Sequence, residues 1–263
     1  TPTTPLPWID GWDLLGEKPR RVPLALVDTT YTLPSPHPAW LPRATTGLAA
    51  GTGLAGALRH ACLELLEREA RHRALRTPHF FDRRQIATAS VTDGRAGAIL
   101  ARLGRAGIAT GIWRIPTPHG LPVYWVQVMQ AAAGLDLAPL PAEGFACDTT
   151  EDAALARALL EACQARLTAI AGAREDVTAE LYRDALDRDA LAAWRRQLTA
   201  GGAPLPADGP GAGMPLAGIV AALATAGARA AIAVPLHLDP DLAVVRVVAP
   251  PLHSNPEAER HGG

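Results

Sequence analysis

Two carboxylates and an arginine lie within five residues of each other in this 263-residue chain. Glu64, Glu67 and Arg68 are three and four residues apart, so a helix would place their side chains on one face. Carboxylates this close repel each other unless a positive group lies between them. A Mg²⁺ ion meets that need, because it takes oxygen ligands and bridges carboxylates to phosphates, while Arg68 can grip a phosphate with two N–H groups. An exposed Glu64–Arg68 pair beside a solvated Glu67 is the ordinary alternative, and spacing alone favours it.

A second polar group occurs about 100 residues later, at Glu161, Gln164 and Arg166. Glu161 and Gln164 are three residues apart and would share a helix face. The apolar residues predicted to pack beside them are Leu155, Ala158, Leu159, Ala162 and Ile170. Spacing alone again favours the simpler interpretation, a half-exposed amphipathic helix.

Other motifs that carry chemistry are absent from the sequence or weak. It contains no P-loop, no HExxH zinc motif and no GxSxG nucleophile turn. Gly51–Gly56 matches GxGxxG, but a proline-rich connector comes before it, so we interpret it as a plain glycine-rich turn. His60 lies one turn before Glu64 and is predicted to be a helix-surface residue. The three cysteines, in apolar surroundings, are predicted core residues.

Periodicity predicts the elements that must position these groups. The expected helices span residues 54–76, 94–107, 151–171, 176–187, 189–198 and 215–226. The expected strands span residues 22–27, 108–115, 122–130, 230–234 and 242–248.

The remaining segments are predicted to be connectors. Residues 1–21 are expected to be irregular, 32–44 to be a proline-rich loop, 44–53 to be a glycine-rich turn, and 200–213 to be a mobile linker. Thr149 and Asp152 have the spacing of a capping box at the start of the third helix.

Composition limits the function classes. Hydrophobic residues make up 48% and charged residues 19%, which is typical of a globular protein. The net charge of −1 provides no basic field, so neither nucleic acid nor a membrane is an expected partner. The longest apolar stretch, Met214–Leu236, is broken by prolines, glycines and an arginine. No signal peptide is visible, and three cysteines do not make a disulfide framework, so a cytoplasmic protein is expected.

Three sequence blocks in order carry a family resemblance. Thr46-Gly-Leu-Ala-Ala-Gly51 leads into a helix with Glu-x-x-Glu-Arg, and the block 152–168 contains Glu-x-x-Gln-x-Arg. The segment Gly172-Ala-Arg-Glu-Asp176 follows. Together these blocks resemble the YcaO family over roughly residues 8–250.

The resemblance implies a fold and domain limits. The expected fold is α+β (mixed α/β), a YcaO-like domain with long helices packed on short-stranded sheets. It would occupy residues 1–251 and correspond to the C-terminal two-thirds of the family's domain, with a disordered tail at 252–263.

The resemblance also implies an activity. YcaO proteins use Mg-ATP to phosphorylate a backbone amide oxygen of a ribosomally made precursor peptide, which leads to an azoline or a thioamide. Carried over by position, the Mg²⁺ ligands would be Glu64, Glu67 and Glu161. The nucleotide contacts would be these three residues with Arg68, Gln164 and Arg166. Expected partners are the precursor peptide, a leader-peptide-binding or E1-like protein, and a second copy in a homodimer.

Three departures from the family pattern stand beside this expectation. The family's earlier Ser-x-x-x-Glu-x-x-Glu helix belongs upstream of Trp8, where this chain has no room for it. Thr45-Thr46-Gly47 replaces the usual Ser-Asn-Gly, and the chain does not end in the Pro-x-Pro-x-Pro tail of some azoline-forming members. A truncated chain, a site shared with another chain and a degenerate relative all stay open. The alternative function is a non-catalytic scaffold subunit of a peptide-modifying complex.

Overall fold

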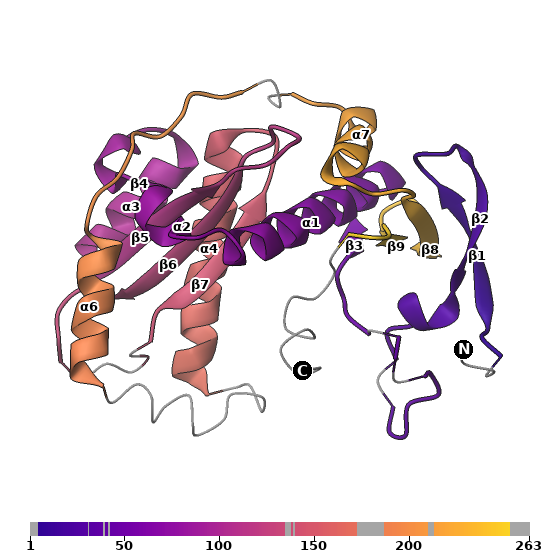
Figure 1. Ribbon diagram of the computed structural model, residues 1–263, viewed down its shortest axis with the longest axis horizontal. Coiled ribbons are helices and arrows are strands. Elements are labelled where there is room, and N and C mark those ends of the chain that lie inside the picture. Colours follow the sequence, from indigo (N-terminus) through magenta and orange to yellow (C-terminus); the bar gives the residue numbers. More distant parts are fainter. Residues whose placement is uncertain are drawn as a thin grey trace. The chain divides into compact units, whose positions relative to one another are not determined.

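The computed structural model describes residues 5–30, 32–38, 40–41, 43–134, 138, 140–172, 187–209 and 213–252. The chain forms two compact units, each with its own antiparallel sheet (Figure 1). The first unit comprises Thr1–His72 and Met214–Gly263, and the second comprises Arg73–Gly213. The predicted tail lies outside the described residues apart from Leu252, so the tail and the boundary at residue 251 stay predictions.

The sheet of the first unit combines strands from both ends of the sequence, in the order β2-β1-β8-β9-β3. The strands are β1 (Trp8–Asp13), β2 (Lys18–Pro23), β3 (Leu48–Gly51), β8 (Ile232–Leu238) and β9 (Ala243–Val248). The core on one side contains Val22, Val27, Ala230, Ile232 and Val234. Strands β8 and β9 confirm the two predicted closing strands to within a few residues.

Three predictions for this unit were wrong. Within the segment 1–21, which was predicted to be irregular, β1 and β2 form a hairpin whose first strand also pairs with β8. The predicted strand 22–27 ends at Pro23, which has no N–H for the ladder, and a 3₁₀ turn, η1 (Leu24–Leu26), follows it. The predicted glycine-rich turn contains a strand, β3, which pairs with β9.

Two helices complete the first unit. Helix α1 (Leu54–Leu75) confirms the prediction for residues 54–76. Its predicted apolar stripe is buried throughout, at Leu58, Cys62, Leu65, Leu66 and Ala70. Helix α7 (Leu216–Ala226) confirms the prediction for 215–226 and ends at Gly227, whose φ of 115° suits glycine.

The sheet of the second unit has the order β4-β5-β6-β7. Its strands are β4 (Gln85–Ile86), β5 (Ile108–Ile115), β6 (Val123–Gln130) and β7 (Ala142–Cys147). The predictions for β5 and β6 are confirmed, whereas β4 and β7 were not predicted.

Helices cover both faces of this sheet (Figure 1). On one face, α4 (Glu151–Ala171) packs on β6 and β7, and α3 (Gly94–Arg105) packs on α4 and β5. On the other face, Phe81 of α2 (Phe80–Arg83) stacks edge-to-face on Trp113 and Trp125, and α6 (Arg188–Leu198) contacts β5 and β6. Mixed helices and antiparallel sheets confirm the predicted fold class, and the predicted bounds of α3, α4 and α6 hold to within two residues.

The start of α4 corrects the predicted capping box. Thr150, not Thr149, is the N-cap, and its side chain accepts a hydrogen bond from Ala153 N. Asp152 instead accepts hydrogen bonds from the backbone of Arg95 and Ala96, at 3.2 and 2.9 Å. It therefore satisfies the first turn of α3, a role that the local sequence cannot reveal.

Three further predictions concern the end of this unit. Ile170 is 39% exposed and so does not join the apolar face of α4. Ala203, in the predicted mobile linker, exchanges backbone hydrogen bonds with Gln85 and Ala87, so this part of the linker is held to β4. The predicted helix 176–187 and the motif after Gly172 lie outside the described residues, apart from Asp187.

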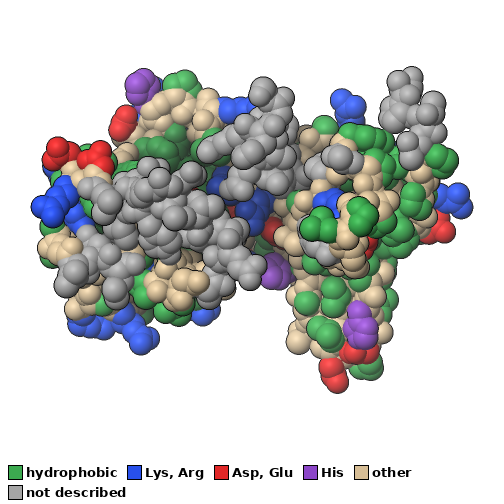
Figure 2. Space-filling view, turned by 90° about the horizontal axis from the view of Figure 1, so that it is seen from below, with side chains coloured by type: hydrophobic (Ala, Val, Ile, Leu, Met, Phe, Trp, Pro, Cys, Tyr) green, Lys and Arg blue, Asp and Glu red, His purple; other side chains and the backbone are tan. Residues whose placement is uncertain are grey.

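Among the described residues, no helix is long and apolar enough to cross a membrane. On the face shown in Figure 2, acidic and basic side chains are interspersed with apolar ones, as the net charge of −1 suggests.

Candidate functional site

The Glu64–Glu67–Arg68 cluster forms on the first unit as its spacing predicts. Arg68 lies between the two carboxylates, with its Nη2 3.7 Å from Glu64 Oε1 and its Nε 3.8 Å from Glu67 Oε1. Both separations exceed hydrogen-bond length. Glu67 is only 6% exposed, so the solvated Glu67 of the ordinary surface alternative is not what the fold produces.

A backbone N–H from the preceding turn orients Glu64. Gly47 N donates to Glu64 Oε2 at 3.2 Å, and the Gly47 carbonyl accepts from Val247 N at 2.8 Å. Gly47 has φ +81°, and a Cβ there would lie 2.2 Å from Val247 O. Only glycine fits this position, which gives a physical reason for the Thr-Gly-Leu-Ala sequence in front of α1.

The guanidinium of Arg68 has an N–H group that can still donate a hydrogen bond. Arg68 Nε is buried and has no hydrogen-bond partner among the described residues. Such an atom favours a ligand with acceptor oxygens, because an unmade buried hydrogen bond costs about 1–3 kcal/mol. Within either unit, no three His, Cys, Asp or Glu side chains of the described chain converge as a metal site. The cluster therefore offers two carboxylates and a cation.

The second predicted group lies on α4, in the other unit. Glu161 and Gln164 are both exposed on this helix, and Arg166 is half-buried. Arg166 Nη1 donates to Ala138 O at 3.0 Å, and its Nη2 donates to Gln130 Oε1 at 3.3 Å. These contacts tie α4 to the region after β6, so Arg166 has a structural role that its spacing did not indicate. The roles of all three residues at a nucleotide site stay predictions.

The other residues of interest behave mainly as predicted. His60 is exposed on α1. Cys62 and Cys147 are buried, and burial raises the pKa of the Cys62 thiol to about 12, which makes it unreactive at neutral pH. Cys163 is only half-buried, so it is not the core residue that was predicted.

A tight ion-pair network in the second unit was not predicted. Glu151, 3% exposed, accepts from Arg114 Nε at 3.1 and 3.2 Å and from Arg114 Nη2 at 2.7 Å. Tyr124 OH donates to the same carboxylate at 2.6 Å. Burial, and then the bond to Glu151, raise the pKa of Tyr124. The only sequence signal was one arginine inside the apolar strand β5.

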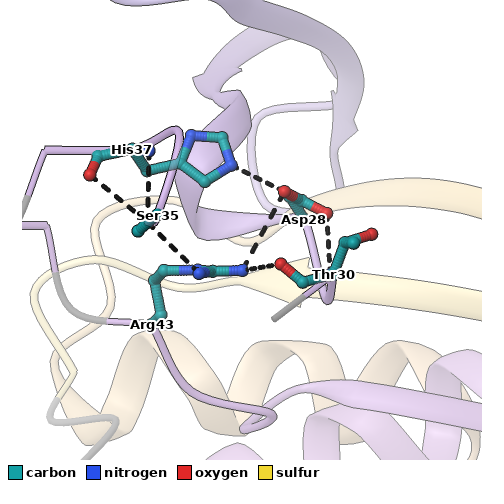
Figure 3. A network of polar contacts seen from close by, with 5 residues as sticks. All are labelled: Asp28, Thr30, Ser35, His37 and Arg43. Atoms are coloured by element: carbon teal, nitrogen blue, oxygen red, sulfur yellow. Dashed lines mark hydrogen bonds and ion pairs between the residues drawn. The ribbon is translucent and has the colours of Figure 1, made fainter. Parts of the chain in front are cut away.

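A second unpredicted network braces the proline-rich loop of the first unit (Figure 3). Asp28 Oδ2 lies 2.6 Å from His37 Nε2 and 4.0 Å from Arg43 Nη2, and Asp28 Oδ1 accepts from Thr30 N at 2.8 Å. Arg43 also donates to Thr30 O and to Ser35 Oγ. The hydrogen bond from His37, followed by that from Thr30 N, lowers the pKa of Asp28 to about 2. His37 and Arg43 lie 9 and 15 positions after Asp28, so no helix or strand spacing in the sequence indicated that they would meet.

Comparison with known proteins places this arrangement in a family. A family model described as YcaO cyclodehydratase, ATP- and Mg²⁺-binding, matches residues 1–253. The chain therefore belongs to the YcaO family, as its sequence blocks predicted. ATP and Mg²⁺, the predicted cofactors, are the ligands named for that family.

Two sequence relatives are uncharacterized proteins. One, from the tfuA 3′ region of Rhizobium leguminosarum bv. trifolii, is 30% identical over 190 residues, which is 71% of this chain and 44% of the relative. The other, from Mycobacterium tuberculosis, is 29% identical over 178 residues, 67% of this chain and 39% of the relative. The chain thus spans less than half the length of either relative.

Solved structures share the fold at low sequence identity. YcaO from Methanopyrus kandleri, bound with AMPPCP and Mg²⁺, has a TM-score of 0.69 at 22% identity and covers 100% of this chain and 69% of that one. A heterocyclase in complex with substrate and cofactor gives 0.67 at 18% identity, with 94% and 33% covered. The Escherichia coli microcin synthetase McbBCD complex with pro-MccB17 bound gives 0.64 at 12% identity, with 94% and 65% covered.

Proposed function

We propose that this chain binds Mg-ATP and activates a backbone amide of a ribosomally made precursor peptide, for azoline or thioamide formation. Membership of a family described as an ATP- and Mg²⁺-binding cyclodehydratase supports this proposal. The observation that carries it is the Glu64–Glu67–Arg68 cluster, in which two carboxylates share one guanidinium at more than hydrogen-bond distance.

The residues of the cluster fit a magnesium-bound phosphate. Carboxylate oxygens are the ligands that Mg²⁺ prefers, and Arg68 Nε lacks an acceptor among the described residues. When bound, Mg²⁺ would neutralise charge on the phosphates. The Gly47 N–H would keep Glu64 aimed while it holds the ion. The proposed site consists of Glu64, Glu67 and Glu161 as metal ligands, with Arg68, Gln164 and Arg166 as nucleotide contacts.

The proposed reaction has two bond-changing steps. The amide oxygen attacks the γ-phosphorus, an O–P bond forms, and the bond to the β-phosphate oxygen breaks to release ADP. A Cys, Ser or Thr side chain, or an external sulfide, then attacks the amide carbon. Phosphate leaves with the former amide oxygen. In the azoline, the side-chain nucleophile and the amide nitrogen each lose a proton, whereas in the thioamide the sulfide loses both of its protons and the amide nitrogen keeps its own. Arg68 would stabilise the phosphoryl oxygens in the first step.

The structural relatives support the choice of substrate class. One is a heterocyclase solved with its substrate, and another belongs to a synthetase complex that holds pro-MccB17. By analogy, we propose a precursor peptide as substrate and a leader-peptide-binding or E1-like protein as partner. A homodimer and a cytoplasmic location remain part of the same proposal.

Calorimetric titration of Mg-ATP tests the proposal directly. The unaltered chain is compared with a Glu64→Gln, Glu67→Gln double variant, with circular dichroism as the check on folding. We expect the double variant to bind Mg-ATP about a hundredfold more weakly, because the metal loses two charged ligands. Equal binding by both proteins would contradict the assignment of these carboxylates.

The same titration separates the enzyme from the scaffold alternative. Binding that depends on Glu64 and Glu67, followed by ADP release in the presence of a precursor peptide, supports the enzyme. A folded chain that binds the peptide but neither binds Mg-ATP nor releases ADP, alone or with its partner protein, supports the scaffold.

A further inference from the structure

An apolar pocket of about 250 Å³ lies in the first unit. Most of the side chains that line this α1–β9 pocket are apolar, and an apolar cavity of about 150 Å³ is enough to hold benzene. Its walls come from η1, the loop before β3, helix α1, strand β9 and the segment after β9. They include Leu26, Leu41, Leu65, Val248, Pro250 and Leu252.

One buried arginine joins two of these walls. Arg246 is 5% exposed and donates from Nε to Leu26 O at 3.0 Å and from Nη2 to Ala44 O at 2.7 Å. The loop between Leu26 and Ala44 is the one braced by the Asp28 network (Figure 3). The pocket is therefore held open by hydrogen bonds of the fold itself, which reduces the ordering cost of binding.

The pocket has two lining residues that are sequence neighbours of groups in the cluster that we assign to Mg-ATP. Thr46 and Leu65 line it. The residue after Thr46 is Gly47, whose N–H binds Glu64, and Leu65 follows Glu64 on α1. A group seated in the pocket would thus lie a few residues from the proposed phosphate site.

An edge strand begins at the same place. Within the described strands, β3 pairs with β9 alone and ends the sheet order β2-β1-β8-β9-β3. Its first residue, Leu48, follows the turn that lines the pocket and donates its N–H to Thr45 O at 2.9 Å, so the Leu48 carbonyl and the backbone of Ala50 are the groups that face away from β9. An edge strand presents backbone N–H and C=O groups to an added strand, and neighbouring pockets select its side chains. A peptide fits this combination, because only a peptide supplies both a matching backbone and a side chain.

We propose that the edge of β3 and the α1–β9 pocket together bind the substrate peptide. An extended segment of the peptide pairs with β3 and inserts one apolar side chain into the pocket, close to the amide that is activated. This inference rests on the proposed function and specifies its substrate: a peptide with an apolar residue near the modified position.

Backbone-amide NMR of the full chain tests the inference with two blocked tripeptides. Acetyl-Ala-Leu-Ala-amide carries the side chain, and acetyl-Ala-Gly-Ala-amide lacks it. We expect saturable shifts at Thr46, Leu48, Ala50, Leu65 and Val247, and at least tenfold weaker binding of the glycine peptide. An Ala44→Leu variant fills the pocket and should weaken leucine-peptide binding at least tenfold. Its matched control, Ala55→Leu on the exposed start of α1, should not.

A second variant keeps the test decisive if Ala44→Leu does not fold. Leu41→Ala enlarges the pocket and should shift the preference from the leucine peptide to acetyl-Ala-Trp-Ala-amide by several fold. Equal affinities for the leucine and glycine peptides, or shifts that do not saturate, would overturn the inference.

Mg-ATP serves as the competitor in the same spectra. Displacement of the leucine peptide by Mg-ATP, with shifts at the same pocket residues, would assign the pocket to the nucleotide base and overturn the peptide inference. If the unaltered chain binds the leucine peptide but does not bind Mg-ATP, alone or with its partner protein, the proposed function is overturned while the pocket inference stands.

Discussion

Two arginine–carboxylate groups, one in each unit, differ in how completely they are hydrogen-bonded. Arg114 and Glu151, in the second unit, share three hydrogen bonds of 2.7–3.2 Å, and Tyr124 adds another at 2.6 Å. Arg68, in the first unit, approaches Glu64 and Glu67 only to 3.7 and 3.8 Å. In the first group, the side chains hydrogen-bond to one another. In the second, Arg68 Nε has no hydrogen bond among the described residues.

This difference separates a structural ion pair from a candidate binding site. A buried charge pair that is fully hydrogen-bonded holds its elements in place, and removal of one partner leaves an uncompensated charge. In the looser cluster, the Gly47 N–H orients Glu64 and Arg68 Nε retains capacity for a ligand. Four predictions test this contrast, beginning with the largest expected effect.

Removal of Glu151 should cause the greatest loss of stability. The Glu151→Ala change leaves Arg114 and the Tyr124 hydroxyl without their acceptor, and we expect the free energy of unfolding to fall by about 3–5 kcal/mol. Urea denaturation measures it. The control is Asp10→Ala, which breaks an exposed 2.8 Å pair with Arg21 and should cost less than about 1 kcal/mol. Similar losses in both variants would refute the contrast.

Substitution of Gly47 should have an intermediate effect on stability and a clear effect on binding. A Cβ there meets Val247 O, and φ is +81°, so Gly47→Ala should cost about 1–3 kcal/mol. The shifted turn should also weaken Mg-ATP binding. Gly56→Ala is the matched control, because a Cβ at Gly56 meets nothing within 4 Å. Undiminished Mg-ATP binding by Gly47→Ala would mean that the turn does not orient Glu64.

Neutralisation of the loose cluster should barely change stability. The Glu64→Gln, Glu67→Gln double variant weakens the attractions to Arg68 and removes the repulsion between the carboxylates, while each glutamine keeps an amide oxygen that can accept hydrogen bonds. We expect its free energy of unfolding to stay within about 1 kcal/mol of the unaltered chain. A loss of several kcal/mol in urea denaturation would show that the cluster is a structural ion pair like that of Glu151.

The contribution of the Asp28 network to stability should be lost in acid. Its folded-state pKa of about 2 lies below the ordinary value of 3.8. The contribution is therefore present above pH 3.8 and is lost as the pH falls toward 2. We expect the free energy of unfolding, measured in urea between pH 5 and pH 2, to fall less steeply with pH for Asp28→Asn than for the unaltered chain. Equal slopes for Asp28→Asn and the unaltered chain would contradict the prediction.

Local sequence was sufficient for the long helices and the central hairpin of the second unit. The bounds of α4, Glu151–Ala171, and of β5, Ile108–Ile115, were predicted to the residue, because apolar spacing and turn residues coincide there. The position of Glu64, Glu67 and Arg68 on one face followed from helix geometry alone. The family assignment followed from three ordered blocks.

Short strands and distant polar partners could not be predicted in the same way. Strand β1 is stabilised by β8, more than 200 residues away, and its own alternation is too brief to distinguish it from a loop. Asp152 has the spacing of a local cap but satisfies another helix, α3. Glu151 and Arg114 are 37 residues apart, and nothing in the spacing joins them.

The sequence by itself determined the long helices and the pairing of Glu64 with Glu67 and Arg68, since each depends on neighbours within a few turns, and its ordered blocks determined the family and with it the fold class. The tertiary structure decided which polar residues are satisfied. Hydrogen bonds require atoms to meet within about 3 Å, and only the folded chain brings Gly47 to Glu64 or Arg114 to Glu151. The same folding left Arg68 Nε, among the described atoms, without a hydrogen bond.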